Sequence, residues 1–104
     1  MFYKATKVTI IAERLLQSGI LKILEAGGAK GYTIVDGSGQ GEHINRKGDR
    51  ASVVRAFSIV RIEFIQTDEA SARAIAEEVS QTYFKQYSGI VYVSPVEVIR
   101  TERF

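Results

Sequence analysis

The sequence predicts a single α+β domain in which two helices cover one face of an antiparallel sheet. Segments with strand periodicity alternate with segments of helical periodicity in the order β-α-β-β-α-β, and a long stretch with neither period separates the second strand from the third. This order is typical of the ferredoxin-like split βαβ arrangement. A length of 104 residues suits one domain, covering residues 1–104.

The first half of the chain supplies a strand, a helix and a second strand. Residues 7–12 are apolar and β-branched, which indicates a strand. Apolar residues at helical spacing then predict a helix over residues 13–26: Leu16, Ile20, Ile23 and Leu24. The glycines at 27–28 end this helix, and residues 31–35 form the second predicted strand.

The second half repeats this pattern. Residues 54–66 alternate between two faces of a long predicted strand. Thr67 and Asp68 can cap a second helix that ends near Phe84, and its predicted buried stripe is Ala72, Ile75, Val79 and Tyr83. The last strand is predicted over residues 90–93. Ser94 and Pro95 are expected to close it because proline cannot donate to a ladder, which leaves 96–99 as a candidate edge strand.

One face of this predicted sheet lacks helices. The third strand places Ile59 and Ile65 on it, and the first and last strands are apolar on both sides. A small domain seldom leaves such a face in water. We therefore expect a closed oligomer that covers the face.

The stretch between the second and third strands is rich in glycine and cations. Gly37, Gly39 and Gly41 alternate in it, and the cations that follow are His43, Arg46, Lys47 and Arg50. Glycine lets a backbone approach a ligand closely, and consecutive N–H groups can surround an anion. We interpret residues 37–54 as a flexible binding loop. A long hairpin tip without a ligand is the alternative, because the loop does not match a dinucleotide-binding or P-loop motif.

Composition excludes several function classes. The formal charge of +2 gives no general case for nucleic-acid binding. No apolar run is long enough for a membrane span, and the start shows no signal-peptide pattern. The absence of cysteine excludes disulfides and thiol chemistry and fits a cytoplasmic protein. One histidine makes no metal site, and no catalytic set has readable spacing, so we expect a protein that is not an enzyme.

Three segments together resemble a known family. They are residues 28–33 (Gly-Ala-Lys-Gly-Tyr-Thr), residues 37–41 with Arg46, and residues 83–92 (Tyr-Phe-Lys-Gln-Tyr-Ser-Gly-Ile-Val-Tyr). With the order of elements, they resemble the PII signalling proteins, and more closely the PII-like branch of SbtB and the carboxysomal PII proteins. The resemblance implies a homotrimer that binds an adenine nucleotide in each cleft between subunits. It also implies a long T-loop, here residues 37–54, that docks on a target protein.

The resemblance also implies roles for individual residues. Thr33 and Ile65 would lie near the adenine, and Glu63 near the base or ribose. The loop base would approach the ribose and phosphates through Gly39, Gln40, Gly41 and Arg46. Gly89 and Ile90 would supply backbone contacts, and the neighbouring subunit would reach the phosphates through Arg100 and Arg103. The partner-binding part of the loop would comprise His43, Lys47 and Arg50. For Glu63, an ion pair with Arg61 or with Arg55 of a neighbour is the alternative.

Two departures from the branch pattern affect the expected ligand. Gln40 stands where the branch has a basic residue, and His43 stands where it has arginine. Losing two charges weakens contacts to a polyphosphate most, which favours AMP or ADP over ATP and leaves cyclic AMP open. A glycine-lysine phosphate turn is missing before the last strand, so sensing of 2-oxoglutarate with Mg-ATP is not supported. Bicarbonate beside the nucleotide fits the carboxysomal branch.

The resemblance places the protein in the cytoplasm, with recruitment to the inner membrane or a carboxysome through its target. That target would be a membrane bicarbonate transporter or a carboxysome-associated protein. Two alternatives remain at this point. One is a CutA-like trimer that binds metal or serves as a scaffold, and the other is a slow nucleotide hydrolase. A single histidine and no cysteine count against the first.

Overall fold

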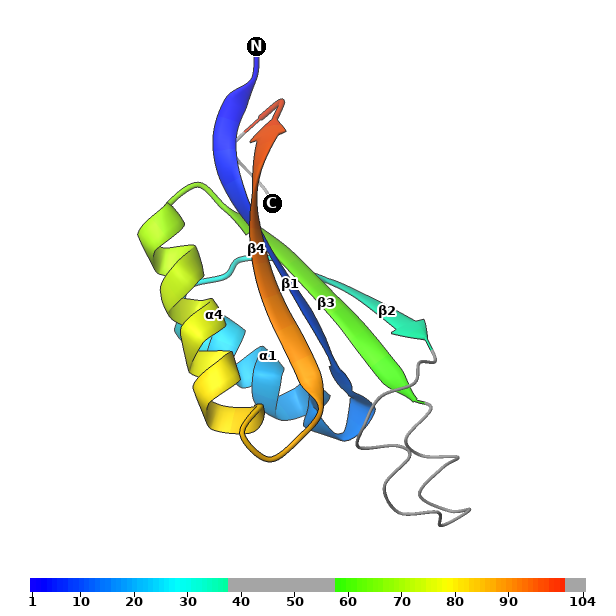
Figure 1. The fold of residues 1–104 in the computed structure, drawn as a ribbon. Helices are drawn as coiled ribbons and strands as arrows, with labels where there is room; N and C mark the ends of the chain where they lie inside the picture. Colours follow the sequence, from blue (N-terminus) through cyan, green and yellow to red (C-terminus); the bar gives the residue numbers. More distant parts are fainter. Residues whose placement is uncertain (38–57, 101–104) are drawn as a thin grey trace.

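The structure, a computed structural model, describes residues 1–37 and 58–100. Four antiparallel strands form one sheet in the order β2-β3-β1-β4, and both longer helices lie on the same side of it (Figure 1). The elements are β1 (Tyr3–Glu13), η1 (Arg14–Leu16), α1 (Gln17–Ala26), β2 (Thr33–Gly37), β3 (Ile59–Gln66), α4 (Glu69–Tyr83) and β4 (Gly89–Val98). The predicted α+β, ferredoxin-like fold is therefore confirmed.

The core lies between the helices and one face of the sheet. The central strand β1 contributes Val8, Ile10 and Ala12 to it, all buried. The predicted apolar stripes of both helices pack there, through Leu16, Ile20, Leu24, Ala72, Ile75 and Val79. Burying each aliphatic side chain of this size contributes about 1.5–3 kcal/mol, so this single layer holds the helices on the sheet. The opposite face has no helix over it in the described part of the chain (Figure 1).

Several predicted boundaries were wrong. β1 begins at Tyr3 rather than at residue 7, and a short 3-10 turn precedes α1. The second strand covers Thr33–Gly37 rather than residues 31–35. Residues 54–57 of the predicted third strand lie outside the described residues. The start of β1 is set by pairing with β4 and the bounds of β2 by pairing with β3, and local periodicity does not report this long-range pairing.

Pro95 does not close the last strand. β4 continues from Gly89 to Val98, with Pro95 opposite Thr6 of β1. In this sheet β4 is an edge strand, and proline is accepted on an edge where the ladder does not need its N–H. Residues 96–98 of the predicted separate strand (96–99) are thus the continuation of β4, and Ile99 lies beyond its end.

The two helices approach closely at Gly19. A Cβ atom at this position would overlap the hydroxyl of Tyr83 and lie 2.9 Å from its Cζ. Glycine costs about 1 kcal/mol relative to alanine inside a helix, so close packing explains its place in α1.

We expect Gly19→Ala to lower the free energy of unfolding by about 1 kcal/mol, because overpacking outweighs the gain in helix propensity. Tyr83→Phe removes the overlapping hydroxyl, so Gly19→Ala should cost less in that background. Urea unfolding of the four proteins at one chain concentration measures the difference. An equal cost of Gly19→Ala in both backgrounds would contradict the packing explanation.

A side-chain hydrogen bond of Tyr32 connects the end of α1 to the start of β2. Gly28 adopts a φ of 95° after the helix, and the chain turns there toward β2. The hydroxyl of Tyr32 then donates to Oε2 of Glu25 at 3.3 Å. Desolvation, together with the hydrogen bond and the charge of Glu25, raises the pKa of Tyr32 above its ordinary value.

A raised pKa means that the folded protein favours the neutral phenol. Its contribution to stability is therefore fully present below the ordinary tyrosine pKa of about 10 and is lost as the pH rises through the folded-state pKa. Glu25→Gln should move the Tyr32 pKa toward its ordinary value, which NMR titration of the Tyr32 ring would measure. Glu77→Gln, an exposed carboxylate on α4, is the control. An unchanged Tyr32 titration in Glu25→Gln would contradict the assignment.

Candidate functional site

The face of the sheet opposite the helices carries four of the described candidate residues: Thr33, Glu63, Ile65 and Ile90. Strand register defines rows that cross this face. One row joins Thr33, Glu63, Thr9 and Tyr92, and the next joins Val35, Arg61, Ile11 and Ile90. We call this surface the open face. It is a mixed surface, with apolar side chains next to charged ones.

The structure brings three predicted adenine-site residues together on β2 and β3. Thr33 lies directly opposite Glu63, and Ile65 follows two residues later on the same side of β3. Thr33 is exposed, whereas Glu63 and Ile65 are half-buried. A polar group, a carboxylate and an apolar side chain thus lie within one patch, which suits a flat ligand with hydrogen-bonding edges.

Glu63 also has an ion partner. Nε of Arg61 lies 3.5 Å from Oε2 of Glu63, within β3 rather than across strands. The Arg61 side chain is 49% exposed and that of Glu63 is 30% exposed. An ion pair this exposed contributes about 0–1 kcal/mol, so it does not prevent Glu63 from also accepting a ligand hydrogen bond.

Gly89 and Ile90 lie on the other side of β1, at the start of β4. Gly89 is opposite Ala12, and Ile90 is opposite Ile11 and 54% exposed. A side chain at Gly89 would overlap the ring of Phe84 and approach the Ile11 carbonyl oxygen to 2.9 Å. This close approach is enough to explain why residue 89 is glycine, and no ligand contact is needed for that explanation. Two strand spacings, about 10 Å, separate β4 from β3, so only an extended ligand could contact both groups in one chain.

Arg100 lies far from the other described candidates. It follows the end of β4, whereas Gly89 and Ile90 begin this strand. Ten residues of extended chain cover roughly 30 Å. One chain therefore does not bring Arg100 to Ile90, and a shared ligand would need Arg100 from another subunit.

Eight predicted residues lie outside the described part of the chain: Gly39, Gln40, Gly41, His43, Arg46, Lys47, Arg50 and Arg103. Their roles remain predictions. The same holds for residues 38–54 of the predicted T-loop (37–54), whereas Gly37 is the last residue of β2.

Sequence reasoning missed Thr9 at the centre of the open face. Thr9 is fully buried between Glu63 and Tyr92 in its row, and within the described residues its hydroxyl has no hydrogen-bond partner. An unsatisfied buried hydroxyl costs about 1–3 kcal/mol. Its place in the alternation of β1 is the signal that could have identified it. Lys7, half-buried two residues earlier, shares this side of β1.

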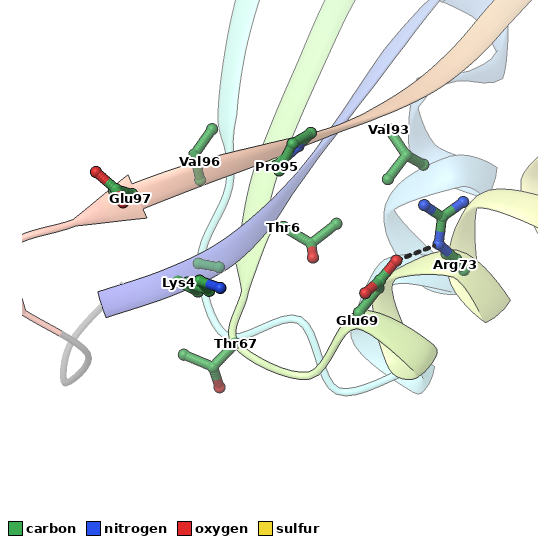
Figure 2. Close-up of a pocket in the computed structure, with 10 residues that line it drawn as sticks. Lys4, Thr6, Thr67, Glu69, Arg73, Val93, Pro95, Val96 and Glu97 are labelled. Carbon is green, nitrogen blue, oxygen red and sulfur yellow. Dashed lines mark hydrogen bonds and ion pairs between the residues drawn. The ribbon is translucent and has the colours of Figure 1, made fainter. Parts of the chain in front are cut away.

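A separate groove lies on the helix side, where β1 and β4 pass the N-terminus of α4 (Figure 2). Its volume is about 520 Å³, and Lys4, Thr6, Thr67, Glu69, Arg73, Val93, Pro95 and Glu97 are among its lining residues. Nε of Arg73 lies 2.8 Å from Oε2 of Glu69 along its side. None of the predicted site residues within 1–37 and 58–100 lines this groove.

The described residues hold neither a metal-binding cluster nor a membrane-spanning helix. Residues 1–37 and 58–100 contain no cluster of three or more His, Cys, Asp or Glu side chains suited to a metal ion. Within the same ranges, no helix has the length and apolar character needed to cross a bilayer.

This chain is similar to a known protein family and to several solved structures. The family model for nitrogen regulatory protein P-II matches residues 5–103. A PII-like signalling protein from Thermus thermophilus is 31% identical, with a TM-score of 0.74 over 94% of this chain and 91% of that chain.

The protein CPII from Thiomonas intermedia is also similar. Its structure with ADP and bicarbonate is 29% identical, with a TM-score of 0.76 over 96% of this chain and 93% of that chain. Its structure with ADP, AMP and bicarbonate is likewise 29% identical, with a TM-score of 0.74 over 96% of this chain and 98% of that chain. The family model covers nearly the whole sequence, and the chain therefore belongs to the nitrogen regulatory protein P-II family.

Proposed function

We propose that this protein is a PII-like regulatory protein that binds AMP or ADP, with bicarbonate as a second ligand, in clefts between the subunits of a homotrimer. The observation that carries the proposal is the similarity to CPII, whose structures hold ADP, AMP and bicarbonate. The patch of Thr33, Glu63 and Ile65 on the open face supports it, because these residues lie together as the nucleotide role requires.

The positions of the residues assigned to the nucleotide favour a binding site that two chains share. Arg100 lies roughly 30 Å of extended chain from Ile90, so one subunit would not supply both to one nucleotide. A homotrimer is consistent with the PII-like relatives and would also cover the open face. Each cleft would then combine the β2–β3 patch of one subunit with Arg100 of the next.

Regulation would act through the loop between β2 and β3. A ligand can signal only if it binds two states of the protein with different affinities. Nucleotide binding beside the ends of β2 and β3 would bias such states of the T-loop, which then binds or releases a partner. We assign the protein to the SbtB and carboxysomal branch in the cytoplasm, with a bicarbonate transporter or a carboxysome-associated protein as the partner. We propose a signalling role rather than catalysis.

Isothermal titration calorimetry with AMP, ADP, ATP and cyclic AMP, each with and without bicarbonate, tests the ligand. We expect AMP or ADP to bind most tightly. Arg46→Ala should raise the Kd for ADP by about 10-fold or more, since it removes a charged hydrogen bond to phosphate. Glu63→Gln should raise the Kd for AMP and ADP alike, because Glu63 is assigned to the base or ribose.

Arg73→Ala provides the matched control, because Arg73 is a surface arginine on α4 outside the assigned nucleotide site. Its Kd for ADP should equal that of the wild type. An Arg46→Ala protein with unchanged affinity would remove the phosphate assignment. Adenylate turnover during the titration would instead favour a nucleotide hydrolase.

A further inference from the structure

The turn after β1 contacts three segments that flank the proposed site. The backbone N–H of Arg14 donates to the carbonyl oxygen of Ser58 at 3.1 Å, and its guanidinium Nη1 lies 3.1 Å from Oδ1 of Asp36. Glu13 accepts the backbone N–H of Ser88 through Oε2 at 3.2 Å. Two adjacent residues therefore hold the end of β2, the approach to β3 and the approach to β4.

The contact of Glu13 is buried and spans a long distance in sequence. Glu13 is 8% exposed, and Ser88 lies 75 positions later in the chain. Hydrogen bonds to charged groups are stronger than neutral ones, so this contact fixes the backbone directly before Gly89 and Ile90. The overlap that any side chain at Gly89 would make with Phe84 shows how closely the chain is packed here.

The contacts of Arg14 lie at the ends of two neighbouring strands. Asp36 precedes Gly37, the last residue of β2, and Ser58 precedes Ile59, the first residue of β3. The side chains of Arg14 and Asp36 are 48% and 62% exposed, so their ion pair is weaker than the contact of Glu13. Its effect is local, because it joins these two strand ends to the same turn.

We propose that Glu13 and Arg14 are positioning residues of the nucleotide site. Glu13 sets the backbone of Gly89 and Ile90, and Arg14 holds the ends of β2 and β3, the two strands that carry Thr33 and Glu63. This inference rests on the proposed function. When the backbone of a site is already held in place, binding costs the protein less conformational entropy. The turn therefore raises the affinity without touching the ligand.

Paired substitutions of Glu13 test the buried contact. Glu13→Ala removes the acceptor and should raise the Kd for ADP by about 10-fold, whereas Glu13→Gln keeps an acceptor oxygen and should have a smaller effect. Ile75→Val, a core change in α4, lowers stability without touching the turn and should leave the Kd unchanged. Equal Kd values for Glu13→Ala and the wild type would overturn the role of Glu13. So would an Ile75→Val effect as large as that of Glu13→Ala.

A charge exchange tests the Arg14–Asp36 pair without depending on Glu13→Ala folding. Arg14→Asp and Asp36→Arg should each raise the Kd for ADP by about 2- to 5-fold, and the double variant should restore it. The matched control is the same exchange at Glu69 and Arg73, an exposed ion pair on α4, which should leave the Kd unchanged. Single variants without effect, or no restoration in the double variant, would overturn the role of Arg14.

Hydrogen exchange in the ligand-free protein separates this inference from the proposed function. Glu13→Ala should speed exchange of the Ser88 amide, while exchange in α4 stays as in the wild type. If the wild type binds no adenylate, the proposed function fails, and this exchange still reports whether Glu13 holds Ser88. Unchanged exchange at Ser88 would overturn the positioning role even if ADP binds.

Discussion

Both helices pack on the same face of a four-stranded sheet, and this one-sided packing determines what the other face must do. The described core lies entirely in that one layer, where β1 presents Val8, Ile10 and Ala12 to the helices. The opposite face keeps partly exposed apolar side chains, with Ile90 at 54% and Tyr92 at 45% exposure, beside the charges of Arg61 and Glu63. A sheet covered on one side must meet something else on the other, either another copy or a ligand at its margin.

This constraint links the fold to the proposed activity. The strand residues assigned to the nucleotide come from β2, β3 and β4, and pairing with β1 holds β3 and β4 in a fixed register. A rigid sheet can keep base-contacting residues in place while the segments that join its strands respond to the ligand. The turn at Glu13 and Arg14 then connects the rigid part to the strand ends on both sides of β1. Pre-ordered contacts and a biased loop are compatible, because they involve different parts of the same chain.

Sequence periodicity was sufficient to predict the element order and the helix stripes. The alternation in β3 predicted Glu63 and Ile65 on one face of the strand and Val60 and Ile62 on the other face, and the structure confirms this separation. Strand ends were harder to predict. β1 begins at Tyr3, before its predicted start, because its first residues pair with the C-terminal part of β4, including Pro95. That pairing joins opposite ends of the chain. Local sequence patterns therefore cannot predict this pairing.

The candidate site could be predicted only in part, for a related reason. Side-chain alternation identifies which residues share a face, but the roles of Thr33 and Glu63 came from resemblance to the PII family. The contact between Glu13 and Ser88 depends on the register of β1 with β4, and the buried hydroxyl of Thr9 depends on its neighbours in two strands. No motif spacing reports either of them.

The most direct measurement of the central claim is the mass of the protein in solution, with Tyr92→Glu beside the wild type in sedimentation equilibrium. We predict a wild type with the mass of three chains. We also predict a folded Tyr92→Glu protein of lower mass with weakened ADP binding, because a charge in the middle of the open face disfavours its burial. A wild type that is a monomer and still binds ADP would show that the site is complete within one chain, and this would contradict the account.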